Sequence, residues 1–255
     1  MRIWTMSYLK MFFLSCFIII ISIVIYSCGA SHQLRDDLIQ LDGEFNYAQI
    51  KNNGIIIAGI SSQIIKFTNE QRMHYSTMLS NEMLKSLKEA HMIHIVNPLQ
   101  LMNKTGKYKY LELMNNYDIE KTLQTETMQF IRDSVPDKRY ILFGYIENEN
   151  IVDQSSDERV KNEEGKEEIE TEYQKTYLLT IGFHVYDLFT QKMVMNDVIY
   201  NQAEQTETRT TSSGCVSSCM ENIFQTILFG EPAEIDREEV LAKIYEKFAK
   251  DLVAL

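Results

Sequence analysis

The residues whose types and spacing could do chemistry in this sequence are cysteines and histidines. Cys215 and Cys219 stand four positions apart in a stretch rich in serine. Two thiols are too few ligands for a zinc site, and redox-active pairs are more often Cys-x-x-Cys at the start of a helix. We interpret the pair as a structural disulfide, with two free thiols as the alternative. On the chain-entropy model, a disulfide that closes so small a loop would raise the free energy of unfolding by about 2 kcal/mol.

The histidines do not assemble into a recognisable reactive group. His91 and His94 flank a predicted strand, where an odd spacing sends side chains to opposite faces, so no metal site is predicted. His184 would need a partner to act as an acid or base, and we interpret it as a half-exposed strand residue. No nucleophile elbow is present. We therefore predict no catalytic residue, no cofactor and no small-molecule substrate, and we expect that the protein is not an enzyme.

The amino-terminal segment has the pattern of a secretory signal. Arg2 and Lys10 precede an almost continuous apolar run over residues 11–26, and small residues follow it. The run is about sixteen residues long, shorter than the roughly twenty that a membrane-spanning helix needs. An uncleaved anchor is the alternative to a cleaved signal.

The end of this segment, Ile25-Tyr26-Ser27-Cys28-Gly29, resembles the lipobox of bacterial lipoproteins. The resemblance implies removal of residues 1–27 and diacylation of Cys28, whose acyl chains would hold the protein on a bilayer at about 0.8 kcal/mol per buried CH₂. Gly29 after the cysteine, rather than Asp, points in the family pattern to the outer membrane. The expected location is therefore the outer membrane, lipid-anchored on the periplasmic side.

The net charge excludes several kinds of partner. It is −11 for the whole chain, and cleavage would make it −13, because the signal carries two basic residues and no acid. An acidic surface repels phosphate backbones and anionic head groups, so nucleic acid is not an expected partner. Other envelope proteins, or a second copy of this chain, are the expected partners.

The apolar patterning predicts a mixed α/β fold. Short strands are expected over residues 55–60, 92–96 and 139–146, and an antiparallel hairpin over 177–200. Helices are expected over 69–90, 99–102, 108–133 and from Asp236 onward, the first and last opening with a capping-box spacing. Residues 28–50 are interpreted as a lipidated tether and 51–255 as a single α/β domain, a mixed sheet with helices packed on it that ends in the hairpin and a carboxy-terminal helix.

Two segments of this domain are predicted to be irregular. Residues 147–175 form an acidic insertion, with nine acids and four bases between Asp153 and Lys175, which is expected to be an exposed loop. An acidic docking arm for a basic partner is the alternative. Residues 202–235 are expected to be a loop that contains Cys215 and Cys219.

The order of elements resembles the superfamily that includes the lipoproteins CsgG and PelC, the lipoprotein activators of penicillin-binding proteins and the amino-terminal domain of TolB. The resemblance rests on the segments GIIIAGI (54–60), RYILFGYI (139–146) and YLLTIGFHVYDLFTQKMV (177–194). It implies a non-enzymatic binding or assembly module. The alternatives are a ring-forming subunit of an export apparatus, of the curli or exopolysaccharide type, and an activator of a peptidoglycan synthase.

Overall fold

The computed structural model describes residues 30–89, 94–161, 165, 167–212 and 234–255. The chain divides into two compact units. The larger unit comprises His32–Val152, Thr176–Ala203 and Asp236–Leu255. The smaller unit comprises Met1–Ser31, Asp153–Lys175 and Glu204–Ile235.

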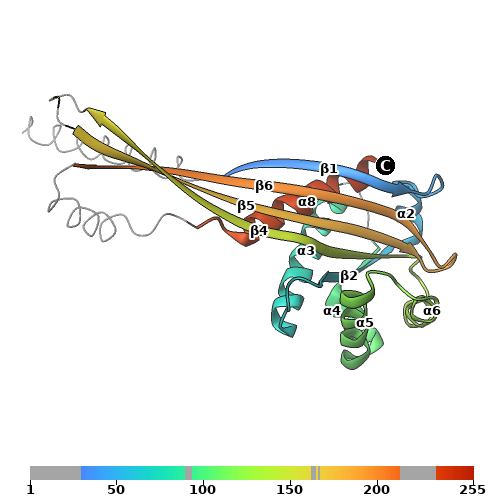
Figure 1. The fold of residues 1–255 in the computed structure, drawn as a ribbon. Helices are drawn as coiled ribbons and strands as arrows, with labels where there is room; N and C mark the ends of the chain where they lie inside the picture. Colours follow the sequence, from blue (N-terminus) through green and yellow to red (C-terminus); the bar gives the residue numbers. More distant parts are fainter. Residues whose placement is uncertain (1–29, 90–93, 162–164, 166, 213–233) are drawn as a thin grey trace, which may run out of the picture. The chain divides into compact units, whose positions relative to one another are not determined.

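A six-stranded sheet is the frame of the fold, with the strand order β1-β6-β5-β4-β2-β3 (Figure 1). Its strands are β1 (Ser31–Leu41), β2 (Ile55–Ser62), β3 (Ile95–Val96), β4 (Tyr140–Lys161), β5 (Glu167–Asp187) and β6 (Lys192–Ser212). β2 pairs in parallel with both β3 and β4. The links from β4 to β5 and from β5 to β6 are too short for a crossover, so these neighbours are antiparallel. The mixed sheet, the final hairpin and the helix that follows it confirm the predicted fold class.

The strand β1 runs antiparallel to β6. Asp42, just after the strand, donates its N–H to the carbonyl of Val194 at 2.8 Å. His32, at its start, lies 3.3 Å from the side chain of Asn201, measured between Nδ1 and Nδ2. Residue numbers therefore fall along β6 as they rise along β1, and β1 forms one edge of the sheet.

Six helices lie among the described residues, most of them opened by a side-chain cap. They are α2 (Tyr47–Asn53), α3 (Asn69–Glu89), α4 (Pro98–Thr105), α5 (Lys107–Glu120), α6 (Thr125–Ser134) and α8 (Arg237–Ala254). The predicted capping box at α3 is confirmed, since Thr68 and Gln71 exchange bonds at 3.0 and 3.2 Å. The helix predicted over 108–133 is two helices, α5 and α6, because Lys121 takes the left-handed conformation that ends α5.

Helices cover both faces of the sheet in the larger unit, because the side chains of β5 alternate between two cores. On one face Phe183 stacks on Phe248 of α8, with ring centroids 3.9 Å apart. On the other face Tyr117 of α5 stacks on Phe143 of β4 at 4.0 Å. The second core includes Ile56, Ala58, Leu101, Tyr110, Met114, Met128, Ile131, Ile141, Tyr186 and Leu188.

The tether expected over residues 28–50 differs from the structure. Residues 31–41 form the strand β1, and residues 47–53 form α2, which Asn46 caps by accepting from the N–H of Gln49 at 3.1 Å. The sequence of β1 does not alternate apolar and polar residues, because most of its side chains are exposed on both faces of the strand. The strand was therefore not predicted. Its position is instead held by β6 and by an ion pair between Asp36 and Lys247 of α8, at 3.0 Å.

The acidic insertion and the start of the predicted 202–235 loop are also strands. β4 continues to Lys161 and β5 begins at Glu167, so the insertion is a hairpin rather than a loop, although most of its side chains are exposed as expected. β6 continues to Ser212. Paired backbone groups satisfy a strand whatever its side chains are, so charge alone does not prevent strand formation when a neighbouring strand is present.

Candidate functional site

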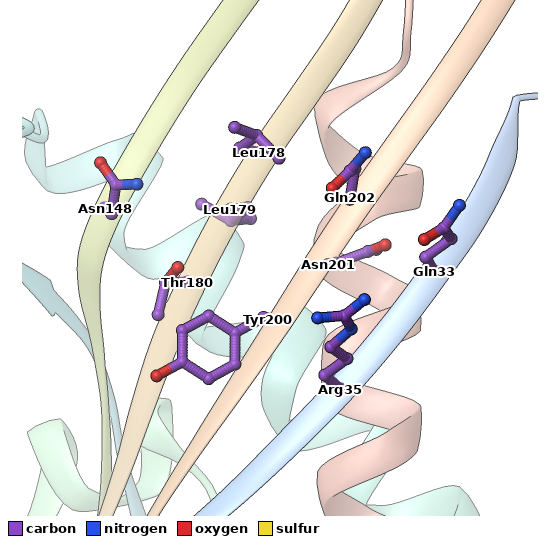
Figure 2. Close-up of a pocket in the computed structure, with 9 residues that line it drawn as sticks. All are labelled: Gln33, Arg35, Asn148, Leu178, Leu179, Thr180, Tyr200, Asn201 and Gln202. Atoms are coloured by element: carbon purple, nitrogen blue, oxygen red, sulfur yellow. The ribbon is translucent and has the colours of Figure 1, made fainter.

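A trough of about 300 Å³ lies on the sheet surface of the larger unit where β4, β5, β6 and β1 run side by side (Figure 2). Nine residues line it: Gln33, Arg35, Asn148, Leu178, Leu179, Thr180, Tyr200, Asn201 and Gln202. Alternation along β6 separates the two sides of the sheet. Asn201 is buried and donates from Nδ2 to the carbonyl of Val240 in α8 at 3.1 Å, whereas the neighbouring residue Tyr200 is 41% exposed.

The trough is lined mainly by side chains that form hydrogen bonds. Its lining includes one guanidinium, one phenol and the amides of Gln33, Asn148 and Gln202, and it includes no carboxylate, imidazole, amine or thiol. The fourth amide, Asn201, is bonded to Val240 on the α8 side. Amides and Arg35 donate hydrogen bonds in fixed planes, and an exposed tyrosine ring offers apolar area with a polar tip. This set suits non-covalent contact with a polar chain such as a peptide backbone. It supplies no nucleophile paired with a base.

His184 is buried beneath α5, which corrects its interpretation as a half-exposed residue. Its Nδ1 lies 2.6 Å from the hydroxyl oxygen of Tyr117, and that hydroxyl lies 3.2 Å from the hydroxyl of Tyr186. Burial, and then the charge of Lys121, lower the pKa of His184 to about 4. Burial also raises the pKa of Tyr117 well above its ordinary range. The three side chains are therefore neutral at neutral pH and form a structural network.

A buried ion pair occupies the carboxyl ends of the parallel strands, where α/β folds often bind ligands. Arg72 of α3 contacts both carboxylate oxygens of Asp118 at 2.9 and 2.5 Å. Asp118 also accepts from the hydroxyl of Ser61 and, at 3.0 Å, from the N–H of Ser62. These hydrogen bonds connect α3, α5 and β2. The charged groups of Arg72 and Asp118 are therefore bonded to each other rather than directed at a ligand.

Of the histidines and cysteines singled out in the sequence, the structure describes His94 and His184. Cys28, Cys215, Cys219 and His91 lie outside the described residues, and His94 is exposed. Within the described part of the chain, no cluster of three or more potential metal ligands occurs. None of the helices that the structure describes is long and apolar enough to cross a membrane.

The trough was missed in the sequence because its residues come from four strands and include no reactive type. The sequence places Tyr200 at the end of a predicted strand and Gln33 and Arg35 in the predicted tether. The sequence offers one signal, a tyrosine that shares a face of β6 with Gln202.

No family model and no curated protein sequence matches the chain. Several solved structures resemble it at low identity. The PelC dodecamer of Paraburkholderia phytofirmans has 9% identity and a TM-score of 0.34, covering 87% of this chain and 97% of that one. A hypothetical protein of Chlamydia trachomatis has 9% identity and a TM-score of 0.34, covering 79% and 98% respectively. A lipoprotein of Neisseria meningitidis has 10% identity and a TM-score of 0.32, covering 69% and 97%. These values assign neither a family nor an activity to the chain.

Proposed function

We propose that this protein is a lipid-anchored binding module of the bacterial envelope, held on the outer membrane through Cys28 and facing the periplasm. It binds and assembles envelope proteins without catalysing a reaction. The anchor is supported by the charged, apolar and small-residue pattern of residues 1–29. The net charge of −11 agrees with a partner that is a protein rather than a nucleic acid.

The trough is the observation that carries the binding role. It presents amides, one guanidinium and an exposed aromatic ring on a rigid sheet, and its lining lacks the groups that a hydrolase or redox enzyme needs. Aromatic residues and arginine are the side chains most often found at the centres of protein interfaces. The trough is therefore the surface that we expect partners to contact.

The short stretch of chain between Cys28 and β1 indicates how far from the membrane a partner would be bound. Ser31, the first residue of β1, is three positions after Cys28, and three extended residues span about 10 Å. A lipidated chain of this kind holds its first strand close to the bilayer. This favours partners at the membrane over an activator of a peptidoglycan synthase, because activators of that kind reach through the wall on long linkers.

A photo-crosslinking amino acid at Tyr200 tests the binding role in living cells. We expect it to yield a discrete adduct that mass spectrometry identifies as an envelope protein or a second copy of this chain. The matched control is the same substitution at Tyr108, a tyrosine on α5 that is 88% exposed and distant in sequence from the trough. Equal adducts from both positions, or none from Tyr200, would contradict the role of the trough.

A ring-forming export subunit is the second candidate, and the native mass of the protein in mild detergent separates the two. A ring gives a single species of many subunits. A binding module gives a monomer or a dimer, to which the partner is added.

A further inference from the structure

The edge strand β1 is built in a way that soluble proteins usually avoid. It lies at one end of the strand order, and among the described residues its one neighbour in the sheet is β6 (Figure 1). It is eleven residues long and contains no proline. Leu38, Ile39 and Leu41 on it are 46, 61 and 40% exposed. A long edge strand with exposed aliphatic side chains is a template for pairing with another strand.

We propose that β1 pairs antiparallel with β1 of a second copy, so that the sheet continues from one subunit into the other. The charges on the strand support this occupant. With Asp36 at the two-fold axis, Arg35 stands opposite Asp37 of the second copy, and Asp37 stands opposite Arg35 of the second copy. Residues directly opposite in an antiparallel pair share a face, so both pairs of opposite charge are within reach.

The neighbouring registers are disfavoured. A two-fold axis perpendicular to the sheet places one residue opposite its own copy, and a register shift moves the axis by whole residues. An axis at Arg35 sets two guanidinium groups opposite each other, and an axis at Asp37 sets two exposed carboxylates opposite each other. The axis at Asp36 also sets two carboxylates opposite each other, but each is already paired with Lys247 of its own α8, at 3.0 Å. That register is therefore the one that the charges select.

The same register covers apolar surface on both faces of the strand. Leu38 stands opposite Leu34 of the second copy, and Ile39 stands opposite Gln33 of the second copy. Each contact occurs twice because the interface is isologous. The pairing therefore buries two of the three exposed aliphatic side chains of β1 while it satisfies the backbone groups of the edge.

Charge reversal tests the register in the full chain, purified in mild detergent, with sedimentation equilibrium as the measurement. Arg35→Asp or Asp37→Arg places like charges opposite each other twice, and each should raise the dissociation constant of the dimer by roughly tenfold or more. The double variant Arg35→Asp/Asp37→Arg restores both pairs with the charges exchanged. Its dissociation constant should return to within about threefold of the original value.

Cysteine pairing supplies a second test that does not depend on the stability of the dimer. Asp36→Cys places a thiol opposite its own copy, so mild oxidation should give a covalent dimer on a non-reducing gel. Gln40→Cys is the matched control on the same strand. In the proposed register it stands opposite His32 of the second copy, and the two introduced thiols are about eight residues, or roughly 26 Å, apart.

Three outcomes would overturn the proposal. The first is a monomer of the unmodified chain at all concentrations, and the second is a dimer that none of the charge variants weakens. The third is a disulfide from Asp36→Cys to a cysteine of the same chain, which would mean that another segment of the chain covers the edge. This dimer deepens the proposed function by naming one partner, a second copy of the chain. Its dissociation constant is measured on the purified protein, whereas the proposed function is tested by crosslinking in cells. A failed crosslink at Tyr200 with an intact β1 dimer would reject the proposed function and keep this inference.

Discussion

Arg139, just before β4, forms an ion pair with Asp187, the last residue of β5. The Nε and Nη2 atoms of Arg139 lie 2.9 and 2.7 Å from the same carboxylate oxygen of Asp187. The other oxygen of Asp187 accepts from the N–H groups of Phe189 and Thr190 at 2.9 and 3.3 Å. One buried carboxylate therefore fixes both the turn between β5 and β6 and the start of β4.

We expect Asp187→Ala to lower the free energy of unfolding by about 2 to 3 kcal/mol, because it leaves Arg139 and two backbone donors without their partner. Burial alone would raise the pKa of Asp187, but Arg139 and the two N–H groups together lower it. The stability that this carboxylate contributes is therefore present above its unfolded pKa of about 3.9 and is lost as the pH falls through the lowered value. Urea denaturation at pH 7 and at pH 3 measures both effects, and equal losses at the two pH values would contradict the assignment.

His184 gives a second dependence on pH, with stability again lost in acid. Its folded pKa of about 4 lies below the ordinary value of about 6.5, so folding favours the neutral ring. The contribution is complete above pH 6.5 and is lost as the pH falls toward 4, by up to about 3 kcal/mol. We expect His184→Gln to flatten the decline of the unfolding free energy over this interval. A variant with the same slope as the unmodified protein would show that folding does not lower the pKa of His184.

Asp197 should give the opposite dependence on pH, with stability lost as the pH rises. It is buried on β6, and burial, followed by the charges of Asp251 and Asp36, raises its pKa to about 6. The protonated form is favoured by folding, so its contribution is present below an unfolded pKa of about 3.9 and is lost as the pH rises through 6. We expect Asp197→Asn to stabilise the protein by about 2 kcal/mol at pH 7.5 and to change little at pH 4.

The control for Asp197 is Asp133→Asn, which removes an exposed carboxylate from α6 and should leave stability unchanged at both pH values. If Asp197→Asn destabilised the protein at pH 7.5, the ionised carboxylate would be stabilising, and folding would not raise the pKa of Asp197.

The sequence predicted the elements that have a strong period or a definite cap. The alternation over 177–185 identified β5, and the Thr68–Gln71 spacing located the start of α3. The same alternation misjudged His184, because it separates two faces but does not reveal that a helix covers each of them. Only the fold brings Tyr117 over the second face.

The parts that were not predicted are those fixed by pairing alone. β1 and the outer halves of β4 and β5 have mixed or acidic side chains, and their backbone bonds to neighbouring strands hold them in place. The trough combines Arg35, Asn148, Thr180 and Tyr200 from four strands, so no local stretch of sequence contains it. A trough of this kind becomes visible only when the strand order is known.

The lipid anchor is tested by the intact mass of the protein extracted from the membranes of cells that produce it with its own leader. We expect a chain that begins at Cys28 and carries diacylglycerol and acyl chains, and the lipid should be lost in Cys28→Ser. An unmodified chain of 29.8 kDa, or a cleaved chain without lipid, would contradict the proposed anchor and the place of this module on the membrane.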